Sequence, residues 1–140
     1  RSFGRMSSGE LPNYTGDLKV ITQNLNSSGT DNRGIPYKIS ASLHYGAPSP
    51  AYLIRELAQE RPVMIGYSTG PNKGHAVLIT ACSYIPTPDG PAIRSIIVRD
   101  PFPTPETKRT AGRVEYWGQS LANLIQTHWY VTVETPANPL

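Results

Sequence analysis

Two apolar segments joined by a short turn-forming loop place the strongest constraint on how this sequence can fold. Residues 75–84 (HAVLITACSY) and 93–98 (IRSIIV) are rich in β-branched side chains, which is typical of strands. The loop between them, residues 85–92 (IPTPDGPA), holds three prolines, an aspartate and a glycine. We therefore predict an antiparallel hairpin that turns near Pro88 and Asp89 and pairs residues whose numbers sum to about 177.

Three other segments carry helix signals. Residues 49–62 begin with Ser49 as an N-cap and a proline at the first helical position, and Pro62 prevents continuation. Residues 17–29 place apolar side chains at helical spacing between a capping aspartate and a closing glycine. A third short helix is predicted within residues 116–127 (YWGQSLANLIQT).

The remaining strands indicate the fold class. Further strands are predicted at residues 37–40, 62–67 and 128–134, and most strands follow one another without a helix between them. Consecutive strands favour an antiparallel sheet with flanking helices, an α+β fold. Glycine and proline together make 26 of the 140 residues and only 16% are charged, which argues against a helical bundle. The length suits one domain over residues 1–140.

Composition also narrows the classes of function. The net charge is +3 with scattered Lys and Arg, so we expect no nucleic-acid partner. No apolar run approaches the roughly 18 residues of a membrane helix, and we expect no membrane partner. His44 and His128 have no ligand spacing with each other or with a carboxylate, and no glycine-rich phosphate loop is found. We therefore expect neither a metal nor a cofactor.

The candidate catalytic residues are His75 and Asp100. In the predicted register His75 lies opposite the neighbourhood of Phe102 and Asp100 opposite Val77, so both emerge at the open end of the hairpin. An imidazole exchanges protons near neutral pH, and a carboxylate on its other nitrogen fixes the tautomer. A purely structural hydrogen bond at a strand end is the alternative interpretation.

A family resemblance bears on this choice. The segments RPVMIGYSTGPNKGHAVLITACSYIPTPDG (61–90) and IIVRDPFP (96–103) resemble papain-like cysteine peptidases. The most similar branch is bacterial and includes secreted effector proteases and the peptidase domains of bacteriocin transporters. The resemblance spans about Leu11 to Val133 and implies the β-rich half of the papain-like fold. It also implies that His75 is the general base and Asp100 the residue that orients it.

The chain departs from that family at the nucleophile. The family's cysteine opens a helix near the N-terminus and follows a glutamine, whereas this sequence begins where that helix should already have ended. We expect the cysteine in a preceding segment or companion fragment. The single cysteine, Cys82, lies seven residues beyond His75, on the opposite strand face and roughly 24 Å away. We predict that it is a small buried apolar residue, and no disulfide within the chain can form.

Three functions remain open at this point. The first is a thiol peptidase that acts on a peptide or protein, with this chain inactive by itself because it lacks the nucleophile. The second is a catalytically inactive papain-like module that binds a peptide or protein. The third is a thiol-independent transferase or deamidase on the same scaffold, which differs from the first only in its substrate.

Overall fold

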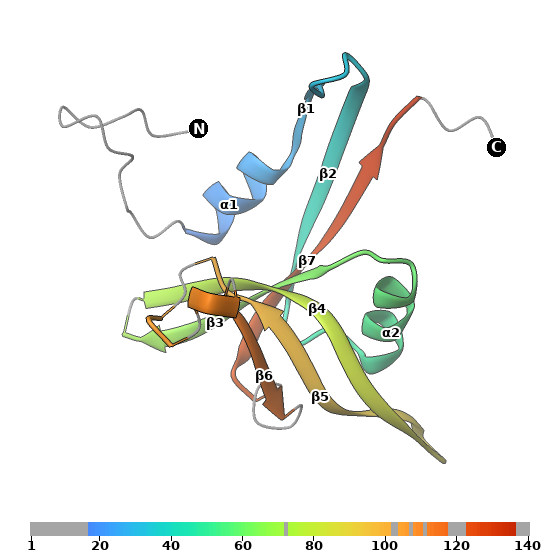
Figure 1. The fold of residues 1–140 in the computed structure, drawn as a ribbon, viewed down its shortest axis with the longest axis vertical. Coiled ribbons are helices and arrows are strands. Elements are labelled where there is room, and N and C mark those ends of the chain that lie inside the picture. The colour runs from blue at the N-terminus through green and yellow to red at the C-terminus, as the bar shows by residue number, and fades with distance from the viewer. Residues whose placement is uncertain are drawn as a thin grey trace. The chain divides into compact units, whose positions relative to one another are not determined.

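The computed structural model describes residues 17–71, 73–101, 104–106, 108–110, 112–117 and 123–136. In chain order the elements are α1 (Leu18–Leu25), β1 (Ser27–Thr30), β2 (Pro36–Tyr45), α2 (Pro50–Ala58), β3 (Val63–Gly70), β4 (Lys73–Thr87), β5 (Gly90–Arg99), a 3₁₀ turn η1 (Lys108–Thr110), β6 (Arg113–Trp117) and β7 (Ile125–Glu134) (Figure 1). The strands form one antiparallel sheet in the order β1-β2-β7-β3-β4-β5-β6. The predicted α+β fold with an antiparallel sheet and helices is confirmed.

The chain divides into two compact units, which are described separately. His44–Trp129 make the larger unit, and the described residues on either side of this range make the smaller one. In the smaller unit Asp17 is the N-cap of α1, and its carboxylate accepts hydrogen bonds from the backbone N–H groups of Lys19 and Val20 at 2.7 and 3.1 Å.

The helix α1 is shorter than predicted. It ends at Leu25, and the following residues form β1 instead, with Gly29 inside that strand. Asn26 explains the early end, because its side-chain amide bonds both the backbone N–H and the carbonyl of Ala41 in β2 at 2.9 Å. These bonds hold the residues after α1 against β2, and β1 pairs with β2 so that Gly29 lies opposite Tyr37.

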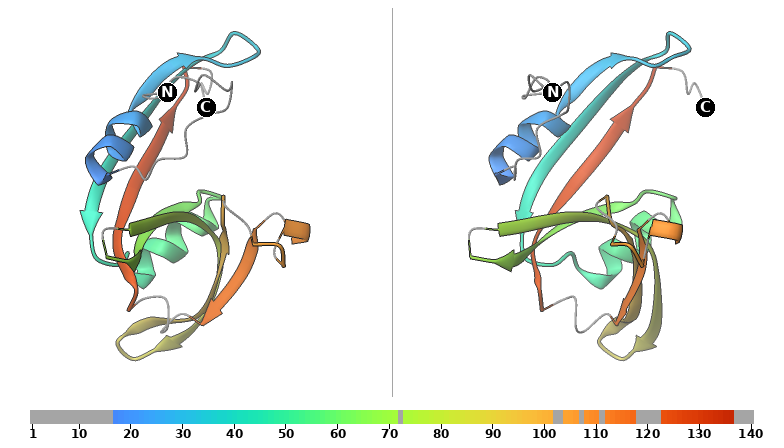
Figure 2. Two further views of the ribbon diagram at one scale, coloured as in Figure 1. Left: turned by 90° about the vertical axis from the view of Figure 1, so that its left-hand side faces the viewer. Right: turned by 60° about the vertical axis from the view of Figure 1, so that its left-hand side comes forward.

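In the larger unit α2 packs on one face of β3, β4 and β5. The Ser49 side chain accepts a hydrogen bond from the N–H of Tyr52 at 3.2 Å and caps the helix, as predicted. Figure 2 shows α2 on the inner side of the curve that β4 and β5 follow. The core consists of buried aliphatic side chains from α2 and these three strands: Leu53, Val63, Ile65, Val77, Ile79, Ile96 and Val98.

The register of the β4–β5 hairpin follows the prediction. Thr87 pairs with Gly90 beside the turn and Leu78 pairs with Arg99 far from it, and both pairs sum to 177. Two irregularities, at Ile79/Ala81 and Ser83/Tyr84, shift the intervening pairs by one residue. A β-bulge inserts one unpaired residue and thereby changes which side chains face the core.

The third predicted helix is wrong over the described part of residues 116–127. Tyr116 is in β6, opposite Ile96, and β7 starts at Ile125, with Thr127 opposite Gly66. Residues 118–122 lie outside the described residues. The spacing of apolar side chains suited a helix, but cross-strand pairing gives these backbone groups partners in the sheet, and tertiary contacts override a weak local preference.

Candidate active site

His75 and Asp100 form the centre of the candidate site. His75 is the third residue of β4, and Asp100 directly follows β5. The Nε2 atom of His75 lies 2.7 Å from Oδ1 of Asp100, and the two side chains are 26% and 19% exposed. The predicted meeting of these two side chains at the open end of the hairpin is confirmed. The site is therefore partly shielded but still reachable from solvent.

The hydrogen bond assigns different tasks to the two imidazole nitrogens. An ionised carboxylate only accepts hydrogen bonds, so the Nε2–H group of His75 is the donor. In the neutral ring Nδ1 then carries a lone pair, and it makes no hydrogen bond to any residue within the described part of the chain. A ring held in this tautomer can take a proton at Nδ1 and return it, as a general base and acid must.

Tyr67 is a third member of the site that the sequence analysis missed. It is the cross-strand partner of His75, and the two rings form an edge-to-face pair with centroids 5.7 Å apart and planes at 85°. Burial raises the pKa of Tyr67 above its usual value, and the proximity of Tyr116 and Asp100 adds to the increase. The sequence contains a signal for this pairing: residues 71–74 are turn-forming types, and a hairpin around them pairs positions 67 and 75.

The backbone of Asp100 is held by Gly112. The N–H of Asp100 donates to the carbonyl of Gly112 at 2.9 Å, and Gly112 is buried with a φ of +74°. A Cβ atom at this position would overlap the carbonyl oxygen of Asp100. Arg99 adds a hydrogen bond from Nη1 to the carbonyl of Thr110 at 2.5 Å. Asp100 is therefore fixed by close backbone packing on the chain that leads into β6.

Cys82 does not belong to this site. It lies seven residues beyond His75 on β4, packs against the core of the larger unit, and pairs with Ile96. Its predicted position on the opposite face is wrong, because the irregularity at Ile79/Ala81 changes the alternation and leaves Cys82 on the core side with Val77 and Ile79. Burial raises the pKa of the Cys82 thiol, so little of it is thiolate at neutral pH.

A second cluster of polar side chains lies beside α2. The rings of His44 and His128 are stacked with centroids 5.4 Å apart, and Nδ1 of His128 lies 2.8 Å from the carbonyl oxygen of Gly46. The Tyr52 ring lies 6.2 Å from that of His128. Nowhere in the described ranges do three or more His, Cys, Asp or Glu side chains gather as a metal site would require.

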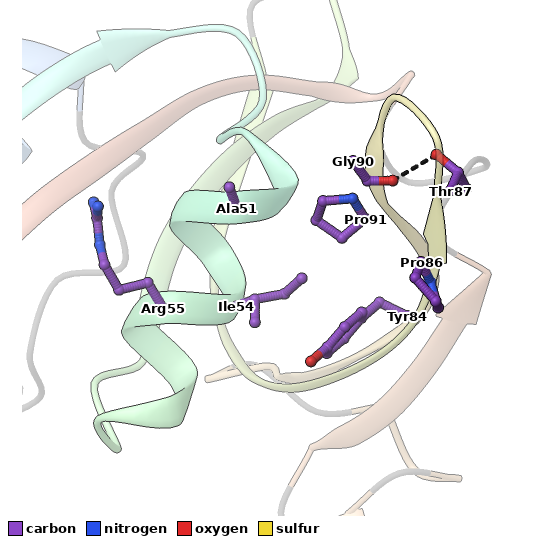
Figure 3. A pocket seen from close by; sticks show the side chains of 8 residues that line it. All are labelled: Ala51, Ile54, Arg55, Tyr84, Pro86, Thr87, Gly90 and Pro91. Atoms are coloured by element: carbon purple, nitrogen blue, oxygen red, sulfur yellow. Dashed lines mark hydrogen bonds between the residues drawn. The ribbon is translucent and has the colours of Figure 1, made fainter.

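The larger unit also contains an open hollow of about 470 Å³ between α2 and the turn end of the β4–β5 hairpin (Figure 3). Most of the side chains around it are apolar: Ala51, Ile54, Tyr84, Pro86 and Pro91, together with Arg55, Thr87 and Gly90. In Figure 3 the guanidinium of Arg55 points away from the hollow. His75 and Asp100 lie at the other end of the hairpin, so the hollow is separate from the candidate site.

No family model matches the sequence, and no curated protein matches it. None of the helices in the described part of the chain has the length and apolar character needed to cross a membrane.

Proposed function

We propose that this chain is the histidine- and aspartate-bearing part of a papain-like cysteine peptidase. The nucleophilic cysteine would come from a segment outside these 140 residues, and the substrate would be a peptide or protein. One observation carries the proposal: the 2.7 Å hydrogen bond that holds His75 through Nε2 and leaves Nδ1 available. The same orientation serves any thiol nucleophile that approaches the Nδ1 side of the ring.

The proposed reaction uses His75 as both base and acid. Nδ1 takes the proton of the cysteine thiol, and the resulting imidazolium stabilises the thiolate. The thiolate attacks the peptide carbonyl carbon, and the carbonyl π electrons move to its oxygen. When this tetrahedral species collapses, the C–N bond breaks and Nδ1–H protonates the leaving amine. Water then attacks the thioester with His75 as base, which releases the acid and restores the thiol. Asp100 holds the ring in one orientation throughout.

The environment of Cys82 explains why an external nucleophile is proposed. It is the only cysteine in the sequence, it packs against the core, and burial raises the pKa of its thiol. These same properties favour a second candidate function, a catalytically inactive module that binds a peptide or protein. The two candidates predict opposite outcomes for the natural protein that contains this chain.

The deciding experiment compares hydrolysis of a degenerate fluorogenic peptide library by this chain and by the longest natural reading frame that contains it. We expect no hydrolysis by the chain alone. We expect hydrolysis by the longer protein, loss of activity in His75→Ala, and full activity in Lys73→Ala, an exposed position on the same strand. A folded longer protein that cleaves nothing would favour the binding module. Hydrolysis by the chain alone that depends on His75 would refute an external nucleophile.

A further inference from the structure

We infer that Tyr67 is a positioning residue for His75: its ring holds the imidazole in the orientation that directs Nε2 to Asp100 and presents Nδ1 to the reacting groups. The inference rests on the proposed function, because only there does the orientation of Nδ1 have a consequence for a reaction. The contact between the two rings is a property of this chain in any case.

The hydrogen bond to Asp100 fixes only one point of the imidazole ring. A ring anchored at Nε2 alone can still swing about that contact, and each swing moves Nδ1. The ring of Tyr67 supplies a second contact from β3, in a direction different from that of Asp100 at the end of β5. Two contacts in different directions, one polar and one aromatic, define the plane of the His75 ring as well as its position.

Tyr67 is itself held firmly enough for this task. It is partly buried and packs against the core cluster of the larger unit. It pairs with His75 on one side and with Ile125 on the other, and the register of β3 with β7 shifts between Gly66 and Tyr67. Irregularities of this kind re-aim a side chain relative to a regular strand. Tyr67 is therefore held by the core and by pairing of β3 with both neighbouring strands, β4 and β7.

The ionisation of Tyr67 is consistent with this role. Burial raises the pKa of Tyr67, and Tyr116 and the carboxylate of Asp100 raise it further. The phenol therefore stays neutral at and above neutral pH and does not compete with Asp100 as an anionic partner for a protonated His75. Tyr67 then acts through its ring, whereas Asp100 supplies the charge.

The test uses the ¹⁵N-labelled 140-residue chain at about pH 8, where an ordinary imidazole is neutral. Long-range ¹H–¹⁵N correlation spectra report which ring nitrogen of each histidine carries the proton. A His75→Gln spectrum identifies the His75 signals among the three histidines of the sequence. In the unmodified chain we expect the Nε2–H tautomer of His75 to predominate.

Two substitutions of Tyr67 distinguish the effect of its aromatic ring from the effect of its hydroxyl group. Tyr67→Phe keeps the ring, and we expect the His75 tautomer ratio to stay unchanged. Tyr67→Leu removes the ring, and we expect the Nδ1–H form to rise by about twofold to tenfold, the factor that an aromatic pair supports. Tyr52→Leu is the control and should leave the His75 tautomer ratio unchanged, because Tyr52 packs against the same core but lies against the ring of His128 rather than that of His75.

Two results would overturn the inference: an unchanged tautomer ratio in folded Tyr67→Leu, or an equal change in Tyr67→Phe and Tyr67→Leu. Amide spectra establish whether each variant folds. If Tyr67→Leu does not fold, Tyr67→Met offers a longer, unbranched and more adaptable side chain without a ring and carries the same expectation. The measurement needs no nucleophile, so absence of peptidase activity would refute the proposed function without changing this result. In an active longer protein we expect Tyr67→Leu to lower kcat and leave KM unchanged, with Tyr67→Phe retaining kcat.

Discussion

The Nε2 atom of His75 and the Oδ1 atom of Asp100 lie 2.7 Å apart, although 25 residues separate these two positions along the chain. The β4–β5 hairpin brings them together, because its turn at Pro88 and Asp89 returns the chain alongside itself. Asp100 is then fixed by Gly112 and His75 is contacted by Tyr67. Each of these relationships can be tested separately.

The first prediction concerns the role of Asp100. In an active longer protein we expect Asp100→Ala to lower kcat by roughly 10²–10⁴-fold, because His75 loses the acceptor that fixes its tautomer. Asp100→Asn should retain more activity, since an amide oxygen can still accept from Nε2–H. Steady-state kinetics with peptide substrate measure both. Asp89→Asn, at an exposed position in the hairpin turn, is the control and should leave kcat unchanged. An unaffected kcat in Asp100→Ala would show that the hydrogen bond is only structural.

The second prediction compares two glycines with similar backbone conformations. Gly112 and Gly34 have φ values of +74° and +79°, but only Gly112 has a backbone neighbour where a Cβ would lie. Gly34→Ala should cost about 1 kcal/mol of unfolding free energy from backbone strain alone. Gly112→Ala should cost at least about 1 kcal/mol more, since the methyl group must displace the carbonyl of Asp100. Urea unfolding measures both, and equal losses would contradict the close packing inferred at Asp100.

The third prediction concerns stability in acid. Burial on its own would raise the pKa of Glu56, but hydrogen bonds from Arg61 and Tyr52 outweigh burial and lower the pKa below the usual 4.5. The folded state therefore binds fewer protons at Glu56 than the unfolded state does. The resulting stabilisation is complete above about pH 5 and is lost as the pH falls through the lowered folded-state pKa.

Glu56→Gln should therefore lower the unfolding free energy by roughly 1–2 kcal/mol at pH 7, and the difference from the unmodified chain should shrink below about pH 4. Urea unfolding across pH 3–7 provides the measurement. Glu115→Gln, at an exposed position in β6, serves as the control and should show little change at any pH. A constant difference across the whole pH range would mean that packing, rather than charge, is responsible for the effect.

The fourth prediction concerns the reactivity of Cys82. Burial raises the pKa of its thiol above the usual 9.0, and packing against the core limits access. Alkylation by iodoacetamide at pH 8 should be at least about tenfold slower in the folded chain than in the same chain in urea. Mass spectrometry of timed samples measures both rates. Equal rates would place Cys82 in an exposed position and reopen it as a nucleophile. In an active longer protein, Cys82→Ser should leave kcat unchanged.

Local signals in the sequence are sufficient to determine several elements of the fold. Ser49 and Pro50 start α2, and the helix ends at Ala58, before Pro62. The Pro- and Gly-containing turn set the hairpin register, so His75 and Asp100 could be paired from the sequence alone. In each case a few neighbouring residues restrict the backbone, and the restriction does not depend on the rest of the fold.

Other features depended on residues distant in the sequence. Residues 125–127 form a strand rather than a helix because β3 offers them pairing partners, and Asn26 ends α1 because Ala41 bonds its side chain. The same applies to the irregularity that places Cys82 on the core side, and to the contacts of Tyr67 and Gly112 with the site. A cross-strand pair or a close backbone contact stabilises the fold only when both partners are in place, so neither local segment alone predicts it. The sequence by itself therefore determined the turn, the α2 helix and the His75–Asp100 pair, whereas tertiary packing decided which neighbours hold that pair in place.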